Sequence, residues 1–177
     1  MKYGLTDYDI EHMPPAMIAS PQRDKNFDGN GTGRNFGAEL GKVVVDGEEI
    51  DAGRKLVRDQ WNSELYKPLD DVRLAEDLVL ENNRLPGFWK GLDNANTLRS
   101  NGIRTLIFAG ANLDQCVLAG LLDAFHEGFD ILLLTDGAAT TSPEFATECV
   151  QWNCELGWGF VLSSEELQRG VNRMRES

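Results

Sequence analysis

The chain has few of the residues that build metal centres or disulfide frameworks. Among its 177 residues only His12 and His126 are histidines, and neither lies near another soft ligand in the sequence. We therefore expect no metal site. The three cysteines, Cys116, Cys149 and Cys154, are odd in number and form no Cys-x-x-Cys pair. This pattern favours a reducing compartment over a disulfide framework.

Basic residues are also scarce. There are 17 Lys and Arg residues against 29 Asp and Glu residues, which gives a formal net charge of −12. Such an excess of negative charge argues against nucleic acid or an anionic membrane as a partner. No segment is apolar and long enough to span a bilayer, and Met1 leads into polar residues rather than a signal-peptide core. We expect a cytoplasmic globular protein with one domain over residues 1–177.

The first part of the chain, 1–75, is polar and glycine-rich, and it gives weak signals of a site. Asp24–Asn30 matches the first half of a calcium loop, but Asn35 stands where a bidentate Glu is needed. A solvated polar loop is therefore expected there. Lys42–Ile50 is predicted to form a hairpin that turns at Asp46-Gly47. A helix is predicted from Ala52 toward Leu65.

The second part, 76–177, alternates short apolar runs with segments of helical periodicity. This alternation predicts a parallel sheet with helices on both faces, a three-layer α/β fold. Strands are expected at Asp77–Leu80, Thr105–Ala109, Ile131 and Gly159–Leu162. Helices are expected at Asp93–Asn101, from Cys116 to a stop at Gly128, from Ser142-Pro143-Glu144 to about Leu156, and after Ser163. Of the four tryptophans, Trp61, Trp152 and Trp158 are expected in the core.

Cys116 stands where the predicted strand at Thr105–Ala109 hands over to a helix. A thiol on the first turn of a helix feels the positive end of the helix dipole, which favours the thiolate. Backbone N–H groups at the same turn can hold an oxyanion. These are the requirements of a cysteine nucleophile that attacks a carbonyl. On the local pattern alone, a buried structural cysteine is the alternative.

The residues around Cys116 extend this interpretation through a resemblance. The run Gly110-Ala-Asn-Leu-Asp-Gln-Cys-Val-Leu-Ala119 is similar to the nucleophile motif of the isochorismatase-like cysteine hydrolases. Asp130–Thr141 resembles the next strand of that family and its Asp-x-x-Ala loop, and Asp77–Trp89 resembles the strand that bears the family's catalytic lysine. Looser similarity to the fungal-type branch extends into the first 61 residues.

The resemblance implies a fold, a chemistry and a set of residues. It implies an isochorismatase-like α/β fold in which Cys116 attacks a small amide, ester or vinyl-ether substrate without an organic cofactor. Backbone N–H groups of Asn112 and Cys116 would hold the oxyanion, and a cis peptide at Ala111-Asn112 would aim them. Trp89, at the C-terminal edge of the sheet, is the candidate substrate contact. The Asp-x-His metal pattern of nicotinamidase-type relatives does not occur in this sequence.

The departures from the family pattern are equally specific. The lysine's place is taken by Asn82 or Asn83, and Pro86 takes that of a common serine. The family's first strand, an apolar run ending in Asp-x-Gln, has no counterpart, which suggests a chain truncated at its N-terminus. Val43–Asp46 could replace that strand and supply its aspartate, but the Asp46-Gly47 turn favours the hairpin.

Three hypotheses follow from these departures. The chain is an impaired hydrolase, a catalytically inactive family member that serves binding or assembly, or an incomplete gene product. The family's first strand lies between the strands corresponding to Asp77–Leu80 and Thr105–Ala109, so its absence would leave unpaired strand edges. Such edges are templates for pairing with another chain, so we expect a homo-oligomer.

Overall fold

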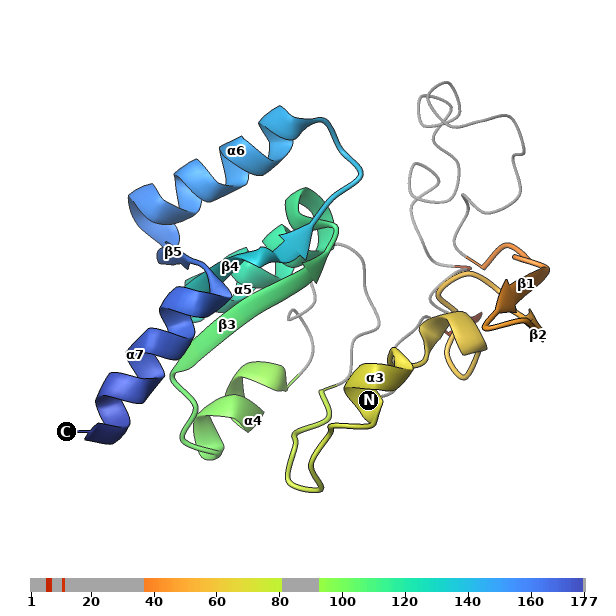
Figure 1. Cartoon of the computed structure of the whole chain (residues 1–177), viewed down its shortest axis with the longest axis horizontal. Coiled ribbons are helices and arrows are strands. Elements are labelled where there is room, and N and C mark those ends of the chain that lie inside the picture. Colours follow the sequence, from red (N-terminus) through yellow and green to blue (C-terminus); the bar gives the residue numbers. More distant parts are fainter. Residues whose placement is uncertain (1–5, 8–10, 12–36, 81–92, 177) are drawn as a thin grey trace. The chain divides into compact units, whose positions relative to one another are not determined.

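The computed structural model describes residues 6, 7, 11, 37–80 and 93–176. Internal contacts group the chain into two compact units, Met1–Arg84 and Leu85–Ser177, and each is described by itself (Figure 1). The calcium-like segment Asp24–Asn30 and the residues Asn82, Asn83, Pro86 and Trp89 lie outside the described residues. That the whole chain is one domain stays a prediction.

The predicted hairpin of the first unit is confirmed. Strands β1 (Lys42–Val45) and β2 (Glu48–Asp51) pair antiparallel, with Val45 opposite Glu48. Asp46 and Gly47 have φ angles of 52° and 86°. Positive φ at both central residues is what a two-residue turn between twisted strands requires. Asp46 therefore belongs to a hairpin turn, and the described residues show no strand beside β1 other than β2.

The helix predicted from Ala52 toward Leu65 is wrong. This segment is a loop that ends in a single 3-10 turn, η2 (Trp61–Ser63), followed by the short helix α3 (Lys67–Asp70). The amide of Asn62 donates to the carbonyls of Ala52 and Arg54, at 2.6 Å and 2.9 Å. Side chains thus satisfy the backbone groups that helical hydrogen bonds would have used.

The strand predicted at Asp77–Leu80 is also wrong. These residues have no regular structure, although Leu78, Val79 and Leu80 form an apolar run. The Asp77 carboxylate accepts a hydrogen bond of 2.9 Å from the N–H of Leu74, which holds a turn instead. Val79 is 49% exposed. A short apolar run becomes a strand only where a neighbouring strand can pair with it, and the described residues offer none there.

The second unit contains the predicted parallel sheet. Its strands are β3 (Thr105–Ala111), β4 (Asp130–Ala139) and β5 (Phe160–Leu162), in the order β3-β4-β5. The helical segments are α4 (Asn94–Ser100), η3 (Leu113–Val117), α5 (Leu118–His126), α6 (Glu144–Asn153), η4 (Cys154–Trp158) and α7 (Ser164–Glu176). The element types predicted after residue 93 are confirmed.

Helices cover both faces of this sheet. Helices α5 and α6 each connect a strand to the next one in the same direction, so right-handed crossovers put both on one face. Figure 1 shows α7 in front of the strands and α5 behind them. The core between sheet and helices contains the fully buried side chains of Leu121, Ile131, Leu133 and Cys154. The predicted α/β architecture is therefore confirmed.

Two glycines end helices and Ser163 begins one as predicted, whereas Ser142, the predicted N-cap of the next-to-last helix, does not cap α6, whose N-cap is Pro143. Gly102 and Gly128, just past α4 and α5, have φ angles of 74° and 82°, a conformation that favours glycine. At the start of α7, Ser163 and Glu166 form a reciprocal capping pair, with the Ser163 N–H donating to the Glu166 carboxylate at 2.8 Å. These local signals were readable because each depends on neighbouring residues alone.

The placement of the tryptophans corrects another prediction. Trp152 is 67% exposed on α6 and Trp61 is 40% exposed on η2, so neither belongs to the core. Trp158 is half-buried. None of the helices in the described part of the chain is long and apolar enough to cross a membrane.

Candidate functional site

The candidate site is built on the connection between β3 and α5. Strand β3 ends at Ala111, and the peptide bond between Ala111 and Asn112 is cis, as the family resemblance implied. A wide helical turn, η3, follows at once and carries Cys116 on its fourth residue. The carbonyl of Asn112 accepts hydrogen bonds from the N–H groups of Gln115 and Val117, at 3.1 Å and 3.2 Å. The Asn112 carbonyl is therefore the acceptor at the centre of the tight backbone turn that carries Cys116.

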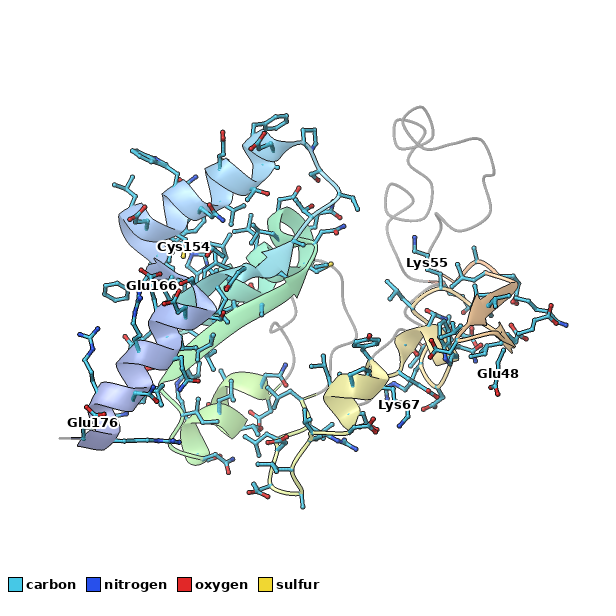
Figure 2. All side chains as sticks on the ribbon, viewed as in Figure 1. Glu48, Lys55, Lys67, Cys154, Glu166 and Glu176 are labelled. Atoms are coloured by element: carbon cyan, nitrogen blue, oxygen red, sulfur yellow. The ribbon has the colours of Figure 1, made fainter. Side chains whose placement is uncertain are left out.

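The three cysteines have different surroundings. Cys116 is half-buried and Cys149 on α6 is exposed, whereas Cys154, labelled in Figure 2, is fully buried. Burial raises the pKa of the Cys154 thiol, which keeps it neutral and unreactive near pH 7. Cys154 is thus a core residue, and Cys116 is the cysteine that lies at the carboxyl end of a parallel strand.

Asp114 fastens the turn of Cys116 to the loop that follows β4. Its carboxylate accepts hydrogen bonds from the hydroxyl groups of Thr140 and Ser142, at 2.5 Å and 2.7 Å. The N–H of Ser142 in turn donates to the Thr140 hydroxyl at 3.1 Å. All three side chains are half-buried. Two segments that lie 26 residues apart in the sequence are therefore held together beside Cys116.

A register shift between β3 and β4 brings these segments level. Phe108 pairs with Leu133, but Gly110 pairs with Ala138, so β4 accommodates extra residues opposite Ala109. Gly137 lies in this irregular stretch, where an added Cβ would be 3.0 Å from the Cβ of Leu134. The bulge advances the end of β4, and Ala139 comes to lie beside Ala111. The two strand ends thus share one edge of the sheet.

Asp136, in the Asp-x-x-Ala segment, serves the fold rather than the Cys116 turn. Its carboxylate accepts hydrogen bonds from the hydroxyl and the N–H of Ser164, at 2.5 Å and 2.8 Å. These two bonds hold the pKa of Asp136 below its usual value. The first residue of α7 is therefore tied to β4, and the carboxylate at the positive end of that helix stabilises it.

Of the residues predicted for the site, the structure brings together Ala111, Asn112 and Cys116, while Trp89 lies outside the described residues. Asp114, Thr140 and Ser142 were not among the site residues predicted from the sequence. Their signal was an acidic residue in the turn and a run of hydroxyl residues after β4, but only the three-dimensional pairing reveals their connection. In the described residues, no group of three His, Cys, Asp or Glu side chains could hold a metal ion.

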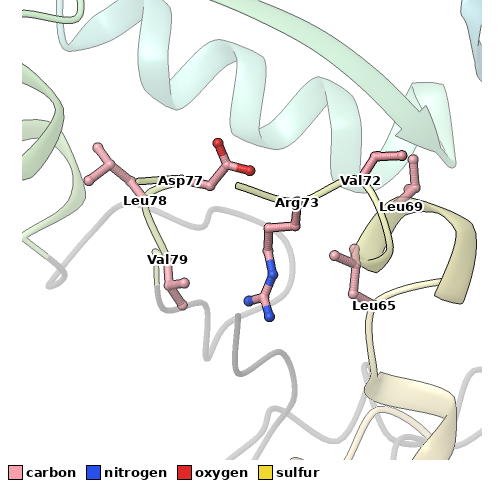
Figure 3. A pocket seen from close by; sticks show the side chains of 7 residues that line it. All are labelled: Leu65, Leu69, Val72, Arg73, Asp77, Leu78 and Val79. Atoms are coloured by element: carbon pink, nitrogen blue, oxygen red, sulfur yellow. The ribbon is translucent and has the colours of Figure 1, made fainter. Parts of the chain in front are cut away.

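Two hollows in the described residues have linings that do not include Cys116. One, of about 350 Å³, is lined in the first unit by apolar side chains such as Leu65 and Val72, together with Arg73 and Asp77 (Figure 3). The other, of about 500 Å³, lies beside the starts of β3 and β4, where Arg104 and Asp130 are found. Neither contains residues of the β3–η3 turn, so neither adds to the candidate site.

Comparison with known proteins identifies the family. Residues 35–166 match the model of the Isochorismatase domain. The chain belongs to the isochorismatase family. It is 32% identical over 114 residues to the ureidoacrylate amidohydrolase RutB of Pseudomonas syringae pv. syringae (strain B728a), and this alignment covers 64% of the chain and 45% of the relative.

A second relative, the ureidoacrylate amidohydrolase RutB of Stutzerimonas stutzeri (strain A1501), is 34% identical over 114 residues, covering 63% of the chain and 44% of the relative. The matched part of this isochorismatase-family chain thus spans less than half the length of these curated relatives. Similarity of this extent fixes the family and the α/β fold.

Solved structures agree on the fold. An isochorismatase-like hydrolase from Alkaliphilus metalliredigens superimposes with a TM-score of 0.59 at 19% identity, covering 66% of each chain. The nicotinamidase PncA from Bacillus subtilis superimposes with a TM-score of 0.54 at 26% identity, covering 60% of this chain and 61% of the other. The isochorismatase-like fold predicted from the Cys116 motif is confirmed.

Proposed function

We propose that the isochorismatase-family site of this chain is centred on Cys116, which acts as a nucleophile toward a small amide, ester or vinyl-ether substrate. The observation that carries the proposal is the location of Cys116 on the η3 turn at the C-terminal end of β3. Ligands of open α/β sheets bind at that edge. The amidohydrolase and nicotinamidase relatives support hydrolysis of an amide as the reaction class.

The chemistry for an amide follows from the thiol. The Cys116 sulfur, having given up its proton, attacks the carbonyl carbon and forms a C–S bond while the C=O electron pair moves to oxygen. The C–N bond then breaks, and the leaving amine takes up a proton. Water next cleaves the resulting thioester, which yields a carboxylic acid and restores the thiol. N–H groups of Asn112 and Cys116 are the proposed oxyanion donors.

We further propose that turnover by the chain as given is impaired. The family's catalytic lysine is replaced by Asn82 or Asn83. Its base, an aspartate on a first strand, has no counterpart in the sequence, and β3 is an edge strand among the described residues. Catalytic groups that act as a unit lose most of their effect when one is removed. We also propose that the chain belongs to the fungal-type branch of the family.

The alternative function is binding or assembly by an inactive family member. One observation favours it: several large apolar side chains, among them Trp152 and Leu156, are exposed on α6 and η4. Exposed apolar patches of this kind mark interaction surfaces. An incomplete gene product is the third hypothesis, and DNA upstream of Met1 that encodes an apolar strand ending in Asp would support it.

An assay of ureidoacrylate, nicotinamide and isochorismate with the wild type, Cys116→Ala and Cys149→Ala tests the proposal. We expect slow turnover, or one round of acylation at Cys116 detected by mass spectrometry, with either signal lost in Cys116→Ala and kept in Cys149→Ala. Activity that persists in Cys116→Ala would refute the nucleophile. Fast turnover that depends on Cys116 would instead refute the impairment and require a replacement base.

A further inference from the structure

Helix α6 is apolar on two opposite sides. On its inner side Val150 is 4% exposed, and Cys154, the first residue of η4, is fully buried. On its outer side Phe145 and Trp152 are each 67% exposed and Cys149 is also exposed, and Leu156, on η4 directly after α6, is 73% exposed. A helix with apolar residues on both sides is normally covered on both. Within the described residues of the second unit, nothing covers the outer side.

The outer residues form a regular seam. Phe145, Cys149, Trp152 and Leu156, here called the α6 stripe, follow one another at steps of four, three and four residues. These steps keep all four side chains on one line along the helix, and they match the seam by which two helices pack together. A monomer's scattered exposed apolar residues have no reason to keep this spacing.

We infer that the α6 stripe is the contact surface for a second copy of this chain, with α6 packed antiparallel against α6 of its partner across a twofold axis. In this arrangement Phe145 would lie opposite the partner's Leu156, and Cys149 near the partner's Trp152. A twofold contact uses the same surface on both copies, so a single stripe on each suffices to close the assembly. The inference stands independently of any reaction at Cys116.

The available area is adequate for a weak dimer. Burying an aromatic side chain completely removes about 150–250 Å² of its surface from water. Phe145 and Trp152 are each 67% exposed, so each would lose about two-thirds of such an area in the dimer. With Leu156, each copy contributes roughly 350 Å² of apolar surface, and the polar rim brings the total to about 1,000 Å². That is the lower limit of specific interfaces, so we expect a dissociation constant in the micromolar range.

Charge along one flank of the stripe gives the dimer a distinctive property. Glu144, Glu148 and Glu155 lie on the same flank of the helical seam. An antiparallel twofold contact brings the acidic flank of each copy beside that of the other. Exposed like charges repel within the screening length of about 8 Å at physiological ionic strength, and added salt weakens that repulsion. The dimer should therefore strengthen with moderate salt, and Glu148→Gln should strengthen it at low salt.

Sedimentation of the full chain from about 1 to about 100 micromolar tests the inference. We expect a concentration-dependent dimer in the wild type and at least a tenfold weaker one in Trp152→Glu and in Phe145→Lys. The matched control is Met174→Glu, because Met174 is also an apolar residue and is 78% exposed, but it lies on α7 and not on the α6 stripe. It should leave the dimer unchanged. Circular dichroism should confirm that all variants fold.

A short bis-maleimide linker gives a second measurement. Because Cys149 lies near the twofold axis, it should cross-link two copies, and the product should disappear in Cys149→Ser and in Trp152→Glu. A wild type that stays monomeric at the highest concentration would overturn the inference. So would a dimer that survives Trp152→Glu but dissociates in Ile107→Lys, because Ile107 is 50% exposed on the edge strand β3. Neither result depends on whether Cys116 is catalytic.

Discussion

Removing the carboxylate of Asp114 should loosen the turn that carries Cys116. Asp114 accepts hydrogen bonds from Thr140 and Ser142, and each bond to a charged acceptor contributes about 1–2 kcal/mol in a half-buried setting. Asp114→Ala should therefore lower the free energy of unfolding by about 2–4 kcal/mol. Asp114→Asn keeps one acceptor oxygen and should cost roughly half as much. Urea unfolding followed by tryptophan fluorescence measures both.

A double-mutant cycle separates this tie from general damage at the site. Thr140→Val and Ser142→Ala each remove one partner of Asp114, and each should couple to Asp114→Ala by about 1 kcal/mol. The rate of Cys116 alkylation should change together with the coupling, because the same bonds position the η3 turn. If Asp114→Ala and the two hydroxyl deletions add within about 0.5 kcal/mol, the network does not act as a unit and the reasoning fails.

Two further predictions concern the frame around the site. Gly159→Ala should destabilise the fold by about 1–3 kcal/mol or more, because the new Cβ would lie 2.2 Å from the backbone oxygen of Ile131. Gly170→Ala on α7, where a new Cβ meets nothing within 4 Å, should be neutral or slightly stabilising. Equal urea midpoints for the two variants would contradict this difference in packing. Hydrogen bonds from Ser164 lower the pKa of Asp136 in the folded state, so the pair stabilises the fold above the unfolded pKa, and this stability is lost as pH falls through the folded pKa. The drop in urea midpoint from pH 7 to about pH 3 should therefore be smaller in Asp136→Asn than in the wild type. An equal drop would show that the pair does not contribute to stability.

The sequence predicted the second unit well because its signals are local. The stops at Gly102 and Gly128, the capping pair of Ser163 and Glu166, and the apolar runs of β3 and β4 each depend on a few neighbouring residues. The family motif then linked Cys116 to the end of a strand. The α/β fold followed from the order of these elements, without knowledge of any long-range contact.

The failures concern segments whose structure depends on distant partners. The segment 52–65 has helix-forming residues, but Asn62 and Ser63 bond its backbone groups and fold it into a loop. Asp77–Leu80 has strand-forming residues but no pairing strand among the described residues. Trp152 is a large apolar residue of the kind expected in a core, but it is exposed on the outer side of α6. The bonds of Asp114 were invisible because they join segments far apart in the sequence.

Native alkylation with peptide mapping shows whether Cys116 is the nucleophile of this isochorismatase-family site. Exposed Cys149 serves as an internal standard and buried Cys154 as a negative control. If reactivity followed exposure alone, half-buried Cys116 would react more slowly than Cys149. We predict that Cys116 reacts with iodoacetamide at pH 7 at least as fast as Cys149, and that the difference vanishes in denaturant. If Cys116 stays unmodified in the folded protein while Cys149 is labelled, Cys116 is not the nucleophile.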